Sequence, residues 1–250
     1  MTMTMGAIAA MIFVLLLTIA LPVGIMLFLH RRGGAWTSFL VGAGIFILFA
    51  LLLEPVVHNL VLGSSLGAAI RGNIWLYGLY GGLAAGVFEE TGRLLAFRVL
   101  LKNRPEGITA LSYGIGHGGA EAFLLVGLTM AANLSLALAC MKGAVPPPEL
   151  AEAAEALFAT PAVTFLWSGL ERLSAMALHV ALSVLVFAAV HTGRRWLFPA
   201  AVGIHALVDF AAVTANAFLP VAATESLVLV LTALTALWAA EIYRKNLKNA

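Results

Sequence analysis

Three short motifs place ionisable side chains three or four residues apart inside long apolar stretches of the sequence. Residues at these spacings share one face of a helix, so each motif would present its polar groups together. Carboxylates beside a cation or an imidazole serve in general acid–base catalysis and in metal binding. The motifs contain Glu89, Glu90 and Arg93 in the first, His117 and Glu121 in the second, and His205 and Asp209 in the third.

The composition requires that the helices carrying these motifs lie in a membrane. Of the 250 residues, 62% are hydrophobic and only 10% are charged, whereas a soluble domain carries about 25% charged residues. Lipid must therefore cover most of the surface, and we predict an all-α, polytopic transmembrane bundle. The net charge of +2 is too small for a nucleic-acid partner, and the single Cys140 excludes an internal disulfide.

Seven apolar stretches are long enough to cross a bilayer, which requires about 20 residues per helix. We expect one transmembrane domain over residues 1–250, with an eighth span only if the fourth stretch is split in two. The predicted spans are residues 5–29, 36–60, 73–101, 108–140, 161–192, 196–218 and 222–243.

The basic residues between these spans predict the orientation. They follow the first, third, fifth and last spans, whereas the alternate loops hold only Arg71 and Lys142. Because cytoplasmic loops are enriched in Lys and Arg, the N-terminus is expected outside and the C-terminus in the cytoplasm. The protein is therefore predicted to be a multi-pass component of the cell (plasma or inner) membrane.

Ten ionisable residues lie well inside the third to sixth predicted spans, away from their ends, where each charged group costs at least about 2.5–3.5 kcal/mol. Five acids against two arginines give a formal charge of −3 with neutral histidines, which protonation or a bound cation must offset. We expect a polar catalytic core within residues 85–215, where these groups face a shared hydrated pocket. They are Glu89, Glu90, Arg93, His117, Glu121, Glu171, Arg172, His179, His205 and Asp209.

Spacing also indicates how some of these residues support the others. Arg93 can hold one of the two preceding carboxylates ionised and leave the other free to take protons. Glu171 and Arg172 are adjacent and are expected to neutralise each other, while His179 shares a helix face with Arg172. Four glycines surround His117, which permits either close helix approach or a local break in the helix.

The ordered set of Glu-Glu-x-x-Arg, a glycine-flanked His and His-x-x-x-Asp resembles the CAAX-protease and bacteriocin-processing superfamily of intramembrane proteases. Within it, the chain looks most like the YhfC branch of membrane peptidases, and the resemblance covers residues 85–215. In the superfamily's prenyl endopeptidases, the Arg of the first motif lies one residue further on than Arg93. These endopeptidases have a Phe at the position that matches Tyr113 and an Asn at the position that matches Asp209.

The resemblance implies a role for each matching residue. Glu89 would be the base, Glu90 and Arg93 would support it, and His117 would help to activate water. The oxyanion site would be formed by His205 and Asp209, whereas Glu121 and His179 have no counterpart in the prenyl endopeptidases.

The favoured hypothesis is peptide-bond hydrolysis by water activated by glutamate and histidine, with no cofactor and with a peptide or membrane protein as substrate. A zinc metalloprotease is the alternative, although no His-Glu-x-x-His motif occurs. A non-catalytic membrane scaffold and a proton-coupled transporter are the alternatives from other classes. In the zinc alternative, the metal ligands would be His117, Glu121, His179 and His205.

Overall fold

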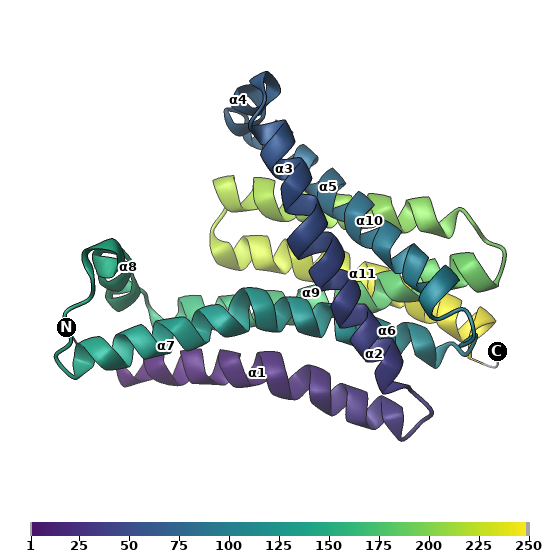
Figure 1. Ribbon diagram of the computed structural model, residues 1–250, viewed down its shortest axis with the longest axis horizontal. Coiled ribbons are helices and arrows are strands. Elements are labelled where there is room, and N and C mark those ends of the chain that lie inside the picture. Colours follow the sequence, from purple (N-terminus) through teal and green to yellow (C-terminus); the bar gives the residue numbers. More distant parts are fainter. Residues whose placement is uncertain (1, 249–250) are drawn as a thin grey trace.

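The computed structural model describes residues 2–248, and these residues are helical with no strand among them. Seven long helices and two short ones make up the described chain (Figure 1). Three of the long helices include a π-helical segment, labelled η. The long helices are α1 (Met5–His30), α2–η1–α3 (Trp36–Phe46, Ile47–Leu53, Glu54–Leu62), α5–η2 (Ile74–Leu95, Ala96–Leu100), α6–η3–α7 (Ile108–Glu121, Ala122–Gly127, Leu128–Met141), α9 (Ala162–His191), α10 (Leu197–Phe218) and α11 (Val221–Asn246), and the short ones are α4 (Ser65–Arg71) and α8 (Pro148–Ala159).

Each predicted span coincides with one long helix, and the protein is an integral, multi-pass membrane protein. Within the described residues, six helices are long and apolar enough to cross a bilayer. The seventh, α5, has comparable length but carries Glu89, Glu90 and Arg93, which make it less apolar. The helix from Ile108 to Met141 is continuous, so the alternative of eight spans is wrong. The chain's two ends lie at opposite ends of the long axis, as an odd number of crossings requires (Figure 1).

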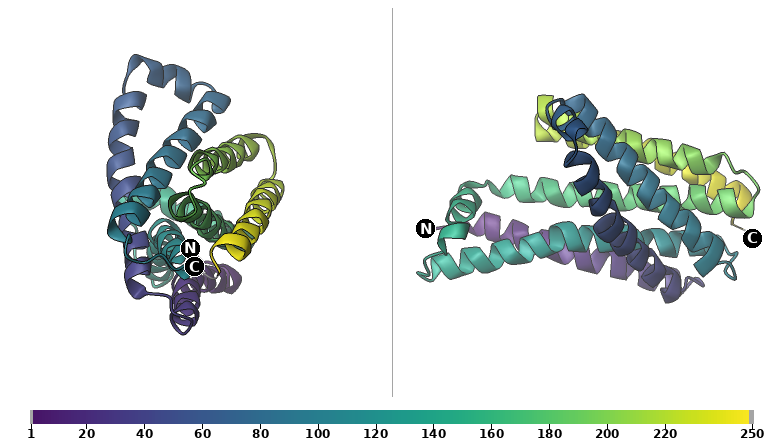
Figure 2. Two further views of the ribbon diagram at one scale, coloured as in Figure 1. Left: turned by 90° about the vertical axis from the view of Figure 1, so that its right-hand side faces the viewer. Right: turned by 45° about the horizontal axis from the view of Figure 1, so that its top comes forward.

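Helix α9 is the central helix of the bundle. It packs against α1, α5, α6, α10 and α11, and most of its apolar stretch is buried. Figure 2 shows these helices running side by side, while α3, α4 and the start of α5 project away from them. The polar residues of α9 therefore lie where several helices meet.

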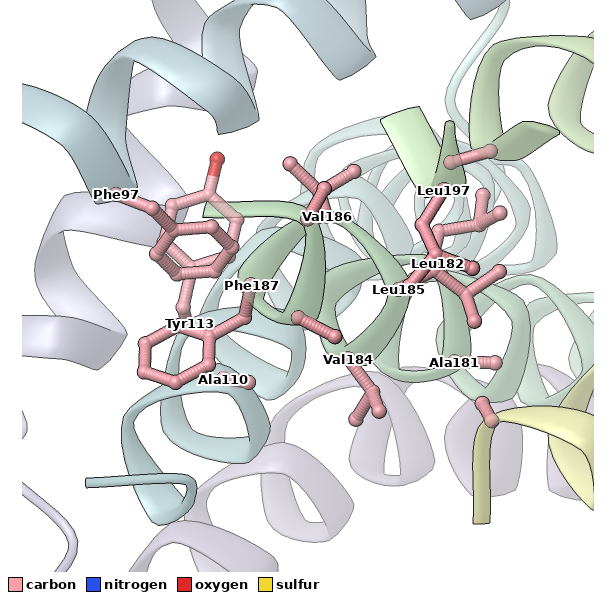
Figure 3. Close-up of a cluster of buried hydrophobic side chains, with 14 of the residues drawn as sticks. Phe97, Ala110, Tyr113, Ala181, Leu182, Val184, Leu185, Val186, Phe187 and Leu197 are labelled. Carbon is pink, nitrogen blue, oxygen red and sulfur yellow. The ribbon is translucent and has the colours of Figure 1, made fainter. Parts of the chain in front are cut away.

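An aromatic cluster packs α5–η2 and α6, which carry two of the predicted motifs, against α9 (Figure 3). The Phe97 ring lies 4.8 Å from that of Tyr113 and 5.1 Å from that of Phe187, between ring centroids. Phe97 follows Arg93 by one helical turn, and Tyr113 precedes His117 by one turn. Packing of this cluster therefore positions the polar groups on α5 and α6.

Glycines let the motif-bearing helices approach closely. On α5, a Cβ atom added at Gly82 or Gly86 would overlap the backbone of α10. On α6, Gly114 and Gly118 lie against the backbone of α9. The helix continues without a break through the glycines around His117, so close approach is the correct interpretation of this motif.

Candidate active site within the helix bundle

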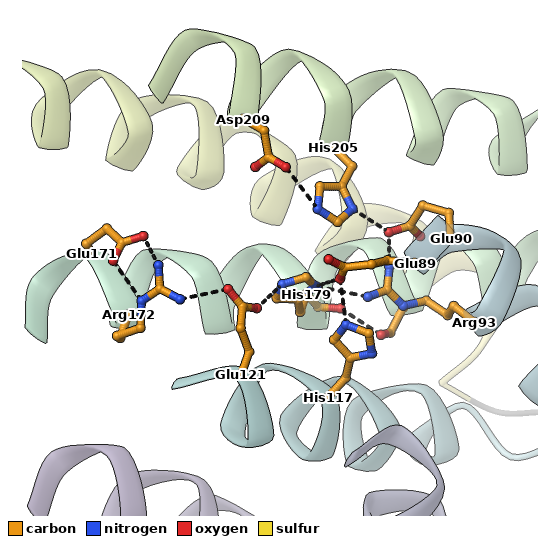
Figure 4. Close-up of polar contacts among 11 residues, drawn as sticks. Glu89, Glu90, Arg93, His117, Glu121, Glu171, Arg172, His179, His205 and Asp209 are labelled. Atoms are coloured by element: carbon orange, nitrogen blue, oxygen red, sulfur yellow. Dashed lines mark hydrogen bonds and ion pairs between the residues drawn. The ribbon is translucent and has the colours of Figure 1, made fainter. Parts of the chain in front are cut away.

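All ten ionisable residues predicted to form the polar core belong to one connected network of hydrogen bonds and ion pairs (Figure 4). They come from four helices, α5, α6, α9 and α10, which correspond to the third to sixth predicted spans. The structure therefore brings the ten residues together, although Glu90, Arg93 and His117 do not line the cavity beside them.

Glu90 connects α5 to α10 at the buried end of this network. Its Oε1 accepts a hydrogen bond from the Arg93 guanidinium and lies 2.9 Å from Nδ1 of His205. Glu90 and Arg93 are fully buried. The stripe of Gly82 and Gly86 continues at the same four-residue interval to Glu90, which explains why this carboxylate faces α10.

Glu89 contacts histidines of α6 and α9. Its Oε2 lies 2.8 Å from Nε2 of His117 and 3.9 Å from Nδ1 of His179. No Lys or Arg forms an ion pair with it among the described residues. Glu89 lines a polar cavity, whereas His117 is fully buried and is not among the residues that line it.

His179 on α9 is held from both sides. Its Nδ1 lies 3.0 Å from the Arg93 guanidinium, and its Nε2 lies 2.5 Å from Oε2 of Glu121. Because a guanidinium only donates hydrogen bonds, Nδ1 must be the acceptor, which leaves the ring proton on Nε2 facing Glu121. Glu121 thus contacts the imidazole from α6, four residues beyond His117.

Arg172 joins two acids at the other end of the network. Its guanidinium donates to Oε1 of Glu121 over 2.8 Å and to Oε2 of Glu171 over 2.7 Å. The expected pairing of Glu171 with Arg172 is present, and Glu121 is added to it. One arginine therefore serves two carboxylates, and this end of the site keeps an excess of negative charge.

The network borders a cavity of about 500 Å³ that is lined by α5, α6, α9, α10 and α11. From the predicted set, it is lined by Glu89, Glu121, Glu171, Arg172, His179, His205 and Asp209. The Asp209 side chain is 35% exposed and lies 3.5 Å from Nε2 of His205. The carboxylates of Glu89 and Asp209, neither paired with Lys or Arg among the described residues, thus face this space.

Glu89, His179 and His205 are close enough to share a metal ion. One donor atom from each lies within 4.8 Å of the others, and all three residues are buried. Three protein ligands with a further position for water are typical of catalytic zinc sites. The predicted metal set shares His179 and His205 with this group, whereas His117 and Glu121 contact its members instead.

Carboxylates beside His179 and His205 can orient both imidazoles for metal binding. Glu90 holds Nδ1 of His205, which leaves Nε2 on the side of Asp209 and the cavity. A carboxylate on the distal nitrogen is the usual support for a metal-binding histidine. His179 has Arg93 on one nitrogen and Glu121 on the other, so an ion bound by His179 displaces one of these contacts. The donor set therefore fits a divalent cation.

The last helix supplies cavity residues that the predicted core did not include. Thr224, Glu225, Val228 and Thr232 of α11 line the same cavity, beyond the expected range of 85–215. Glu225 is an acid within the seventh predicted span, and the two threonines lie eight residues apart on one helix face. These signals were present in the sequence, but an isolated acid near a helix end resembles an interfacial residue.

The fold and the site define a multi-pass membrane protein with a buried glutamate and histidine centre. The profile of the YhfC intramembrane metalloprotease family matches residues 17–230. The chain is also 35% identical over 231 residues to the uncharacterized membrane protein YhfC of Bacillus subtilis (strain 168), a match that covers 87% of this chain and 89% of that protein. The chain belongs to the YhfC intramembrane metalloprotease family. No solved structure matches it.

Membership of this family supports intramembrane proteolysis as the activity, in agreement with the sequence-based expectation. The predicted preference for a metal-independent glutamate mechanism gains no support, because the family's description specifies a metalloprotease. The zinc alternative is closer to that description.

Proposed function

We propose that this protein is a metal-dependent intramembrane endopeptidase whose ion is held by Glu89, His179 and His205. The observation that carries the proposal is the convergence of these three side chains from α5, α9 and α10 within 4.8 Å. They meet at a cavity large enough to hold several residues of an extended peptide. The family's description as a metalloprotease supports the same assignment.

The charge of the site supports a cation at this position. Glu90 is paired with Arg93, and Arg172 serves Glu121 and Glu171. The remaining carboxylates, Glu89 and Asp209, have no guanidinium or ammonium partner among the described residues. A divalent ion beside them would offset most of the formal −3 expected from the sequence.

Zinc bound here would supply a Lewis acid and lower the pKa of a bound water. The protein's own residues orient the ligands and transfer the proton. Glu90 and Glu121 orient the two imidazoles. His117 fixes one oxygen of Glu89 through the 2.8 Å contact between Nε2 and Oε2.

We assign the proton transfer to Asp209. Its carboxylate is the most exposed acid beside the ligand group, at 35%, and it borders the cavity next to His205. In this position it can take a proton from the attacking water and return it to the amine that leaves.

The contact between Glu89 and His117 favours a second candidate, the metal-independent hydrolysis predicted from the sequence. In that mechanism Glu89 is the general base, and His117 orients it and the water. His205 and Asp209 then line the oxyanion site. The two candidates assign different roles to the same residues, so substitutions can separate them.

Metal analysis of the purified full-length protein tests the proposal. We expect close to one zinc per chain, loss of that metal in His205→Ala, and retention in His191→Ala, a control on α9 that is outside the cavity. Proteolysis of a membrane reporter should stop with a chelator and return with zinc. Metal-free protein with full chelator-resistant activity would refute the metal-dependent mechanism and favour the glutamate mechanism.

A further inference from the structure

Two hydroxyls on the α11 wall of the cavity have no hydrogen-bond partner among the described residues. Thr224 and Thr232 are 4% and 2% exposed, and neither side-chain oxygen has a hydrogen-bond partner among the described residues. Both residues line the cavity that contains Glu89, His179 and His205. Buried polar atoms of this kind are costly unless a partner satisfies them.

Neighbouring hydroxyls on the same helix behave differently. Ser226 donates to the carbonyl of Ala222 over 2.7 Å, and Thr235 to that of Leu231 over 2.8 Å. This bond to the preceding turn is the usual way in which a helical Ser or Thr satisfies its hydroxyl in a membrane. Thr224 and Thr232 do not form it, so their oxygens are available to a molecule in the cavity.

A carboxylate with an unused oxygen lies beside Thr224. Oε2 of Glu225 is buried and has no partner within residues 2–248, and Glu225 lines the cavity. The arginine on the facing wall, Arg172, is already shared by Glu121 and Glu171. This end of the cavity therefore favours a positively charged group.

The same seven-residue interval occurs on both walls. Arg172 precedes His179 on α9, and Glu225 precedes Thr232 on α11, and all four line the cavity. Seven helical residues span about 10 Å, a distance that about three residues of extended chain cover. The acidic end of the cavity thus lies about three substrate residues from the ligand group.

We propose that Glu225 is a specificity-determining residue that binds a Lys or Arg side chain of the substrate about three residues from the scissile bond. Thr224 and Thr232 donate hydrogen bonds to the unwound substrate backbone, whose carbonyls need partners once the helix is opened in the membrane. The inference rests on the proposed proteolytic function and names its substrate class as segments with an intramembrane or juxtamembrane basic residue.

Synthetic Leu/Ala-rich spanning peptides, incubated with the full-length protein in liposomes, provide the cleavage test. A single Lys is moved one position at a time, a norleucine series is the uncharged reference, and mass spectrometry locates each cut. We expect the cut to move with the Lys at a constant separation of about three residues, and the Lys series to be cleaved about tenfold faster, since a charged hydrogen-bonded pair is lost in the reference.

Two substitutions on α11 make the comparison specific. Glu225→Gln should abolish the preference for Lys, whereas Glu241→Gln should keep it, because Glu241 is exposed and pairs with Lys245 outside the cavity. Cut sites in the wild type that ignore the Lys position would overturn the inference.

A binding measurement separates this inference from the proposed function. Fluorescent Lys and norleucine peptides are titrated onto Glu89→Gln protein with and without Glu225→Gln. We expect about tenfold tighter binding of the Lys peptide, lost when Glu225 is replaced. Selective binding without cleavage by the wild type would support the inference and count against proteolysis, while equal binding of both peptides would refute the inference.

Discussion

Oε1 of Glu90 lies 2.9 Å from Nδ1 of His205, although 115 residues separate them along the chain. The same oxygen accepts a hydrogen bond from Arg93. One carboxylate thus neutralises a buried guanidinium and sets the orientation of an imidazole on the neighbouring helix, so it contributes to both the stability and the geometry of the site.

Replacing Glu90 should destabilise the bundle strongly. Glu90→Ala leaves the fully buried Arg93 without its ionic partner, a change that costs about 3–5 kcal/mol in unfolding free energy. Denaturant titration in detergent measures it. The double variant Glu90→Ala/Arg93→Met should recover part of the loss because no unpaired charge remains, and Glu241→Ala, on the exposed part of α11, should change stability little. A Glu90→Ala protein as stable as the wild type would contradict the assigned ion pair.

Substitutions of the two cavity carboxylates should separate the candidate mechanisms. If Glu89 is a metal ligand, Glu89→Gln loses the ion and the activity together. If Asp209 is the general base, Asp209→Asn keeps the ion and lowers kcat by about 10²–10⁴-fold. Bound metal and reporter cleavage are measured on the same samples. In the glutamate mechanism Asp209→Asn would stay active, because Asn can still donate a hydrogen bond to the oxyanion.

Much of this architecture was predictable because apolar length alone sets the helices that cross a bilayer. The seven stretches and the polar residues within them follow from the cost of placing charge in lipid. That cost also required Glu89, His117 and His205 to face a common interior. The ion pairs were harder to predict from the sequence. Spacing indicated that Arg93 pairs with either Glu89 or Glu90, and only the packing of α5 on α10 assigns it to Glu90.

The cavity wall could not be derived in the same way. Thr224 and Thr232 resemble the many helical hydroxyls that bond to their own backbone, and nothing in their sequence neighbourhood shows that they do not. The resemblance implied that His117 helps to activate water, yet it lies behind Glu89 and does not line the cavity. Which side of a helix faces the site depends on where the neighbouring glycines allow close approach.

The position of His117 predicts an indirect role in the metal-dependent mechanism. His117→Phe removes the contact that holds Oε2 of Glu89 but leaves His179 and His205 in place. Loss of such a support typically costs 10–100-fold in metal affinity or activity. The zinc affinity, measured by titration, and the rate of reporter cleavage should therefore each fall by about that factor. Excess zinc should restore part of the activity. Complete loss of activity with normal zinc affinity would instead favour His117 as a direct partner in activating water.

Adjacent glycines on α5 offer a test of how helix packing sets the site. A Cβ at Gly82 would overlap the backbone around Ala206 of α10, one residue after His205, whereas a Cβ at Gly81 has nothing within 4 Å. Gly82→Ala must therefore push α10 away from α5, with a stability cost of about 1–3 kcal/mol, and must lengthen the contact between Glu90 and His205. Gly81→Ala removes the same backbone freedom without this displacement, so any difference between the two variants reports the packing. We expect Gly82→Ala to lose zinc affinity and activity together while Gly81→Ala keeps both. Equal behaviour of the two variants would show that the close approach of α5 to α10 is not what positions His205.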